Sequence, residues 1–204
     1  MPYRSTDKTR QKKDAKRAAL MQAAVRVFAE NGYHSATIRD IVDSAGVAVG
    51  TFYFYFPDKE TLFIFLYEET AEFLLQTLQQ AISGRATLPQ QLSAAIQSYV
   101  NIGIFEPAVV HLLLVGGVGA VAALEEKRNE FRESLVNLWQ KPLNKALDQG
   151  MIIPQNTRRT AEAVAGAVDE VILNLLNQSD PQEQASAAVE DLTQFTLRAI
   201  NYVG

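Results

Sequence analysis

Apolar side chains recur at three- and four-residue intervals along almost the whole chain, which is the spacing of one face of an α-helix. Leu20, Ala24 and Phe28 follow this spacing early in the sequence, and Val164 and Val168 follow it late. Gly, Pro and Asn residues interrupt the pattern and mark the helix ends. The spacing predicts an all-α fold of about nine helices, with an N-terminal three-helix head followed by a C-terminal helical bundle.

Five side chains are placed where a helix is expected to begin. Their oxygens can accept a hydrogen bond from a backbone N–H of the first turn. The predicted N-caps are Thr37, Asp58, Thr87, Asn156 and Asp180. The first helix is expected from about residue 13 to Asn31-Gly32, the seventh from about 122 to 149 with a kink at Pro142, and the ninth from 180 to about 202. The aromatic run Phe52–Phe56 has high strand propensity, but we expect a helix because helical stretches flank it.

The amino-acid composition excludes several kinds of catalytic and metal-binding site. The chain has 204 residues, 48% of them apolar, and no cysteine, so thiol catalysis and Cys-ligated zinc are excluded. Its two histidines, His34 and His111, lie far apart, and we expect neither a metal site nor a cofactor. No apolar run reaches 18 residues, and the N-terminus is basic and polar. We therefore expect a cytoplasmic protein with no membrane partner.

Charge is distributed unevenly along the chain. Residues 1–60 carry ten Lys or Arg and seven Asp or Glu, whereas residues 61–204 carry nine and sixteen. Seven of the basic residues lie within the first 17 positions. Such a basic end indicates either contact with a polyanion or a solubilising tail. The expected organisation is a basic arm at 1–17, a head at 18–60 and a C-terminal domain at 61–204.

The head has the spacing of a helix-turn-helix module. The predicted helix after Thr37 is two turns long, Gly46-Val47 turns the chain, and about two further turns follow. Phe52 and Phe56 are expected to point inward. The outer surface of the third helix is then available to contact base edges and phosphates. Its expected outward residues are Ala48, Val49, Gly50, Thr51, Tyr53, Phe54 and Tyr55.

The residues from Thr37 to Leu62, TIRDIVDSAGVAVGTFYFYFPDKETL, resemble the DNA-binding signature of the TetR/AcrR family of bacterial regulators. The resemblance covers residues 18–66. It implies a homodimeric, ligand-responsive regulator, usually a repressor bound to a palindromic operator in double-stranded DNA. It also implies that Thr37, Thr51, Tyr53, Tyr55 and Lys59 contact DNA, mostly at phosphates.

Two positions depart from the family pattern. Ala48 occupies the usual Ser position and lacks its hydroxyl, and Val49 stands where many members have Lys or another polar residue. We expect the basic arm to compensate by reaching the duplex backbone or a minor groove. The arm residues expected to contact DNA are Arg4, Lys8, Arg10, Lys12 and Lys13.

The C-terminal domain is expected to bind an effector and to dimerise. The candidate lining residues are mostly apolar with few polar groups, which favours a small lipophilic or acyl-chain effector over a sugar or a metal. The expected effector-binding residues are Phe65, Phe73, Tyr99, Phe105, His111, Leu114, Trp139 and Asn174. The apolar stripes of the last two helices are expected to form a four-helix dimer interface, although they can also pack on their own core. The expected interface residues are Val164, Val168, Ile172, Leu175, Val189, Leu192 and Phe195.

The sequence leaves other functions open. Gly117, Gly119 and Ala122 follow an apolar run with the spacing of a dinucleotide-binding turn, but no other strand is predicted to support it. A regulator of the same fold can also activate transcription or act without a small-molecule effector. The acidic C-terminal domain argues against a non-specific DNA-packaging protein.

Overall fold

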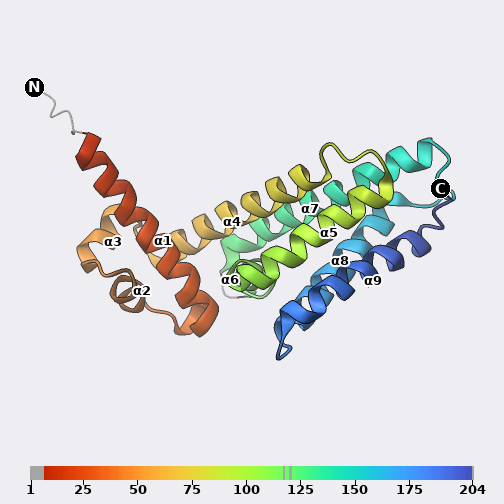
Figure 1. Ribbon diagram of the computed structural model, residues 1–204. Coiled ribbons are helices and arrows are strands. Elements are labelled where there is room, and N and C mark those ends of the chain that lie inside the picture. Colours follow the sequence, from red (N-terminus) through yellow and green to blue (C-terminus); the bar gives the residue numbers. More distant parts are fainter. Residues whose placement is uncertain (1–6, 117, 120, 204) are drawn as a thin grey trace, which may run out of the picture. The chain divides into compact units, whose positions relative to one another are not determined.

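The computed structural model describes residues 7–116, 118–119 and 121–203, which form nine helices and no strand (Figure 1). The prediction of an all-α fold is confirmed. The helices are α1 (Asp7–Ser35), α2 (Ile38–Ala45), α3 (Val49–Tyr55), α4 (Lys59–Ile82), α5 (Leu88–Phe105), α6 (Pro107–Leu114), α7 (Ala122–Asp148), α8 (Thr157–Leu176) and α9 (Pro181–Ala199). Side chains are described from Gln11 onward, except that of Lys12.

The chain divides into two compact units. The head comprises residues up to Glu69 together with His111–Lys127, and the body comprises Thr70–Val110 and Arg128–Gly204. Residues 111–127 therefore belong with the head, which differs from the predicted division at position 60. In the head α1, α2 and α3 pack against one another, and in the body α5, α8 and α9 do so.

Side-chain oxygens cap the predicted helix starts. Thr37 accepts the Asp40 N–H, and the Asp40 carboxylate accepts the Thr37 N–H in return. Asp58 accepts the Thr61 N–H at 2.7 Å. The remaining three predicted caps, Thr87, Asn156 and Asp180, each accept the N–H of the third helical residue. All five predicted N-caps are confirmed.

Helix α1 departs from its predicted bounds. It begins at Asp7 and not near residue 13, so the part of the basic segment from Asp7 to Arg17 is the start of a helix and not a separate arm. Gly32 has φ 72° and ψ 162°, which breaks the helical geometry where the end was expected, although helical hydrogen bonding resumes to Ser35. Helix α7 continues through Pro142, and α9 ends at Ala199, three residues before the predicted end.

Lys59 anchors the end of α1. Its Nζ donates to the carbonyl oxygens of Tyr33 at 2.7 Å and Ala36 at 2.8 Å, and lies 4.3 Å from the centre of the Tyr33 ring. Partial burial lowers the pKa of the Lys59 ammonium. The side chain thus satisfies backbone oxygens at the end of a helix, where intrahelical donors run out.

The body contains a buried polar group among its apolar side chains. Asp169 on α8 accepts a hydrogen bond from the Tyr99 hydroxyl at 2.9 Å and pairs with Arg132 on α7. Burial raises the pKa of Asp169 and outweighs the opposing effects of these two partners. Trp139 is fully buried, and its Nε1 has no hydrogen-bond partner among the described residues.

Two kinds of feature are absent from the part of the chain that the structure describes. None of their helices is long and apolar enough to cross a membrane. No group of three or more His, Cys, Asp or Glu side chains among them is placed to hold a metal ion.

Replacing Lys59 with Met should destabilise the head, because two carbonyl oxygens lose a charged donor. If the free energy of unfolding of the head falls by about 2 kcal/mol, the protected amides of α1–α3 should exchange hydrogen roughly 30-fold faster. The matched control is Lys16→Met, which removes an exposed lysine from α1 and should change these rates little. Equal exchange in the two variants would show that the Lys59 contacts contribute no stability.

Candidate nucleic-acid interface

Helix α3 has one buried side and one exposed side. The side chains of Phe52 and Phe56 are 0% and 4% exposed, whereas those of Val49, Tyr53 and Phe54 are 46%, 56% and 64% exposed. The helix has seven residues, too few to be stable alone, so burial of its two phenylalanines must hold it in place. Both predicted inward positions are therefore buried, and of the predicted outward positions Val49, Tyr53 and Phe54 are exposed.

The turn before α3 places this exposed side. Gly46 has φ 64°, a left-handed conformation that favours glycine, and its N–H donates to carbonyl oxygens at the end of α2. Ala48 takes the N-cap position without a side-chain hydrogen bond. Ala48 and Gly50 are exposed, and Thr51 is half-buried. A helix, a glycine turn and a second helix with an exposed outer side form a helix-turn-helix.

Tyr55 joins α3 to α1. Its hydroxyl donates to the Lys13 carbonyl oxygen at 2.8 Å, and the side chain is half-buried. The Lys13 ammonium lies 5.1 Å from the centre of the Phe54 ring. Tyr55 was expected to point outward, but it is half-buried and its hydroxyl hydrogen is directed to the backbone of α1; its contact with a phosphate stays a prediction.

Thr37 is exposed, but its hydroxyl is already engaged. It accepts the Asp40 N–H at 3.1 Å and donates to the Asp40 carboxylate at 2.7 Å. These hydrogen bonds with Thr37 lower the pKa of Asp40. The hydroxyl thus has the capping role that the sequence predicts. A phosphate contact at Thr37 would require this hydroxyl to break its hydrogen bond with the Asp40 carboxylate.

Two cations of the head are directed to protein groups. Lys59 was predicted to contact a phosphate, and its Nζ instead bonds the carbonyl oxygens of Tyr33 and Ala36. The Arg17 guanidinium lies 4.7 Å from the centre of the Phe65 ring. These contacts stabilise the head and leave fewer donors directed outward than the sequence suggests.

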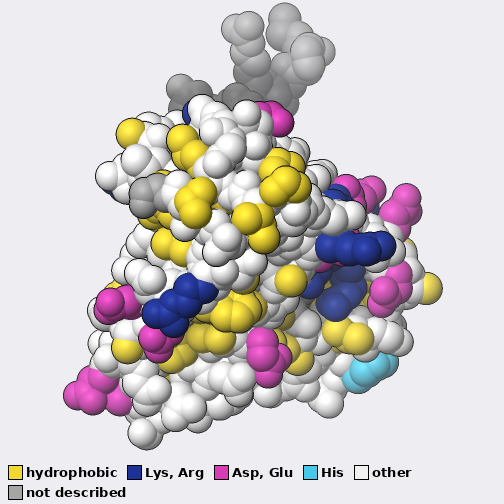
Figure 2. All heavy atoms as spheres, turned by 90° about the vertical axis from the view of Figure 1, so that its right-hand side faces the viewer, with side chains coloured by type: hydrophobic (Ala, Val, Ile, Leu, Met, Phe, Trp, Pro, Cys, Tyr) yellow, Lys and Arg dark blue, Asp and Glu magenta, His cyan; other side chains and the backbone are white. Residues whose placement is uncertain are grey.

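Most of the predicted arm falls outside the described part of the structure. Arg4 lies outside the described residues, as do the side chains of Lys8, Arg10 and Lys12. Lys13 is described and exposed. Figure 2 shows one face of the molecule, on which acidic and basic side chains are interspersed with exposed hydrophobic ones.

The predicted effector residues do not gather around one cavity. Phe65 packs against Phe56 in the head, with ring centres 5.8 Å apart. Phe73 and Phe105 are 50% and 70% exposed, which corrects their assignment to an enclosed pocket. His111 is exposed and Leu114 half-buried in segments of the head, whereas Tyr99 and Trp139 are buried in the body, and Asn174 lies on the surface of α8.

The predicted dimer residues mostly face their own chain. Phe195 is 54% exposed, but the other six are at most 6% exposed within a single chain. This corrects the predicted interface: the most apolar stripe of α8 and α9 forms the core of the body. The six buried residues are Val164, Val168, Ile172, Leu175, Val189 and Leu192.

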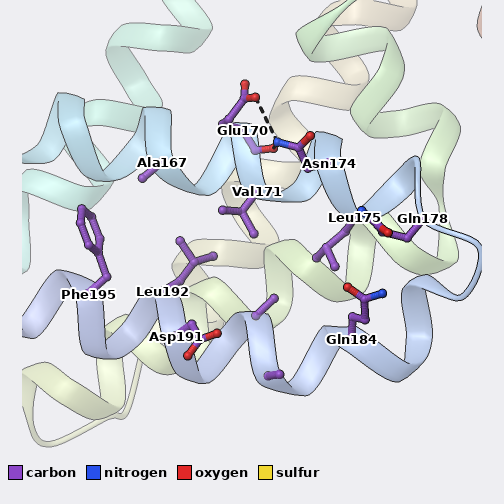
Figure 3. Close-up of a pocket in the computed structure, with 12 residues that line it drawn as sticks. Ala167, Glu170, Val171, Asn174, Leu175, Gln178, Gln184, Asp191, Leu192 and Phe195 are labelled. Atoms are coloured by element: carbon purple, nitrogen blue, oxygen red, sulfur yellow. Dashed lines mark hydrogen bonds between the residues drawn. The ribbon is translucent and has the colours of Figure 1, made fainter.

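A groove of about 600 Å³ runs between α8 and α9 (Figure 3). Val171 and Leu192 point into the space between the two helices, and Phe195 lies opposite Ala167. Leu175, Leu192 and Phe195 of this groove were expected at the dimer interface and Asn174 in the effector site. Ala167 and Val171 were expected in neither, although they lie four residues apart, one helical turn. The groove is lined by Ala167, Glu170, Val171, Asn174, Leu175, Gln178, Gln184, Ala187, Ala188, Asp191, Leu192 and Phe195.

Two family descriptions match the chain. "Bacterial regulatory proteins, tetR family" matches residues 20–65, and "Tetracyclin repressor-like, C-terminal domain" matches residues 89–197. The fatty acid metabolism regulator protein of Bacillus subtilis is 30% identical over 156 residues, which cover 75% of this chain and 79% of that protein.

Two solved structures share the fold and 25% sequence identity. The fatty acid degradation regulator FadR from Bacillus halodurans has a TM-score of 0.81, covering 92% of this chain and 97% of that one. FadR from Bacillus subtilis, in complex with stearoyl-CoA, has a TM-score of 0.75, covering 86% and 97%.

The dinucleotide-binding alternative is set aside by these findings. The apolar run before Gly116 is helix α6 and not a strand, and Gly117 lies outside the described residues. The matching family consists of DNA-binding transcription regulators and not of enzymes. With a helix-turn-helix head and matches to both the N-terminal and the C-terminal family descriptions, the chain belongs to the TetR family of bacterial regulatory proteins.

Proposed function

We propose that this protein is a cytoplasmic repressor that binds a palindromic operator as a homodimer and dissociates when a long-chain acyl-CoA binds its body. The observation that carries the proposal is the likeness, over 86% of the chain, to a FadR regulator in complex with stearoyl-CoA. Repression is supported by the match of residues 89–197 to a repressor-like C-terminal domain.

The groove between α8 and α9 supports the homodimer. Exposed Phe195 and half-buried Val171 and Ala188 form an apolar surface on two adjacent helices. A second copy related by a two-fold axis would place the same two helices against them and complete a four-helix interface. Two heads related by that axis would read two inverted half-sites, which is why the operator is proposed to be palindromic.

Trp139 supports an effector site in the body. Its Nε1 is a buried donor without a hydrogen-bond partner, and such groups carry a free-energy cost unless an acceptor reaches them. Tyr99 and Trp139 are the two largest aromatic side chains fully buried in the body, so an entering acyl chain would meet an apolar surface there. A carbonyl oxygen of the effector is the kind of acceptor that Trp139 lacks.

The proposed response is a shift between two arrangements of the dimer. Helix α4 is continuous from Lys59 in the head to Ile82 in the body. If acyl-CoA favours a body arrangement that displaces α4, the separation of the two heads changes, and the operator is bound less tightly.

Selection from a random pool of duplex DNA should enrich one inverted repeat, because a two-fold dimer presents two equal reading heads. Sequencing of the bound fragments checks this, and the unselected pool serves as the control. Enrichment of a single unrepeated half-site would contradict the palindrome, and no enrichment at all would contradict sequence-specific binding.

Replacing Phe195 with Asp should convert the dimer to a monomer, because the charge would be buried at the proposed interface. Light scattering after size-exclusion chromatography measures the mass of each variant. Phe105→Asp is the matched control, since Phe105 is also an exposed phenylalanine of the body but does not line the groove. Equal masses for the two variants would place the interface elsewhere.

Stearoyl-CoA should lower operator affinity by at least about tenfold, the effect of about 1.4 kcal/mol of coupling between the two sites. It should also change the fluorescence of Trp139, the single tryptophan of the chain, without loss of far-UV helical signal. Coenzyme A without the acyl chain is the control and should do neither. Tighter operator binding with stearoyl-CoA would contradict the proposed release of DNA by the effector. Stabilisation of the protein by polar metabolites alone would exclude a lipophilic effector.

A further inference from the structure

The reading side of α3 lacks the side chains that identify most bases. From Ala48 to Phe56 every residue is apolar, aromatic, glycine or hydroxyl-bearing. Arg and Lys read guanine in the major groove, and Asn and Gln read adenine, through paired hydrogen bonds. None of these four residue types occurs in the segment, so α3 lacks the paired hydrogen bonds that most often identify guanine and adenine.

What α3 exposes instead is apolar. Val49 is 46% exposed at the first position of the helix, and the preceding Ala48 is exposed as well. Burying such groups against another apolar group is favourable, because it removes both from water. The major groove has one apolar group on its base edges, the C5 methyl of thymine.

Exposed cations of the head lie on α1 and α2, the two helices that pack against α3. Lys13 lies against the Phe54 ring of α3, and its backbone oxygen is held by the Tyr55 hydroxyl. Lys16 on α1 and Arg39 on α2 are exposed. Cations beside an apolar reading surface can bind phosphates without regard to sequence, and this leaves base discrimination to α3.

We propose that Val49, with Ala48 beside it, reads thymine methyl groups in the major groove, so that each operator half-site is specified largely by thymine at the positions facing the start of α3. This inference rests on the proposed function, because it requires a sequence-specific operator. It gives a chemical role to the position where a polar or basic residue of the family pattern is replaced by valine.

The test uses the full-length protein and the duplex found by selection. Each thymine is replaced in turn by deoxyuridine, which lacks the C5 methyl but pairs identically. At one or two thymines of each half-site, we expect affinity to fall about three- to fivefold per methyl, the effect of removing one buried methyl group from an apolar contact. Fluorescence anisotropy of the labelled duplex measures the affinity.

A second variant connects the effect to Val49. Val49→Ala keeps the helix and changes an exposed side chain, so it should fold normally, as far-UV circular dichroism can show. The variant should bind the thymine duplex several-fold more weakly than the unchanged protein does. Its affinity should then fall little further when deoxyuridine replaces thymine. Lys16→Gln is the comparison: it should weaken binding to both duplexes by the same factor, since it removes only a phosphate-directed charge.

The outcomes separate this inference from the proposed function. A protein that selects an operator but shows no loss at any deoxyuridine overturns the thymine-methyl reading and leaves the repressor intact. An equal deoxyuridine loss in Val49→Ala and the unchanged protein overturns the role of Val49. Failure to select any sequence overturns the proposed function itself.

Discussion

Burial of Phe52 and Phe56 is the interaction on which the reading surface depends. Helix α3 has seven residues and no side-chain cap, so its helical hydrogen bonds alone cannot keep it folded in water. The two rings lie 6.1 Å apart on its buried side, and Phe56 in turn contacts Phe65 of α4. Because the helix cannot rotate without exposing these rings, their burial also decides which residues face outward.

Polar contacts to the backbone complete this attachment. Tyr55 and Lys59 both donate to carbonyl oxygens of α1, one near its start and one near its end. Each bond ties a residue of the reading module to the long helix beside it. The same contacts occupy two groups that otherwise have the chemistry to hold phosphates. In this head, Tyr55 and Lys59, both predicted to contact DNA, therefore stabilise the fold through the backbone of α1.

Local features of the fold could be predicted from the sequence, and features that depend on a distant partner could not. Thr37 and Asp58 cap their helices through residues three positions away, so their roles follow from spacing alone. The carbonyl partners of Lys59 lie 23 and 26 positions earlier, and no periodicity points to them. Periodicity likewise showed that α8 has an apolar stripe, but Val164 and Val168 are buried within their own chain, and only tertiary packing decides that direction.

The same limit explains why the exposed side of α3 was easier to predict than the location of the residues expected to bind an effector. One amphipathic helix has a single buried direction, which Phe52 and Phe56 reveal. An effector cavity is lined from several helices at once, and an aromatic residue such as Phe73 or Phe105 can satisfy the local pattern and still lie on the surface. The unpaired Nε1 of Trp139 is a more specific indicator, because an unsatisfied buried donor is unfavourable in the absence of an acceptor, whereas a buried ring is not. For the proposed effector site, this donor is therefore a better guide than the aromatic side chains are.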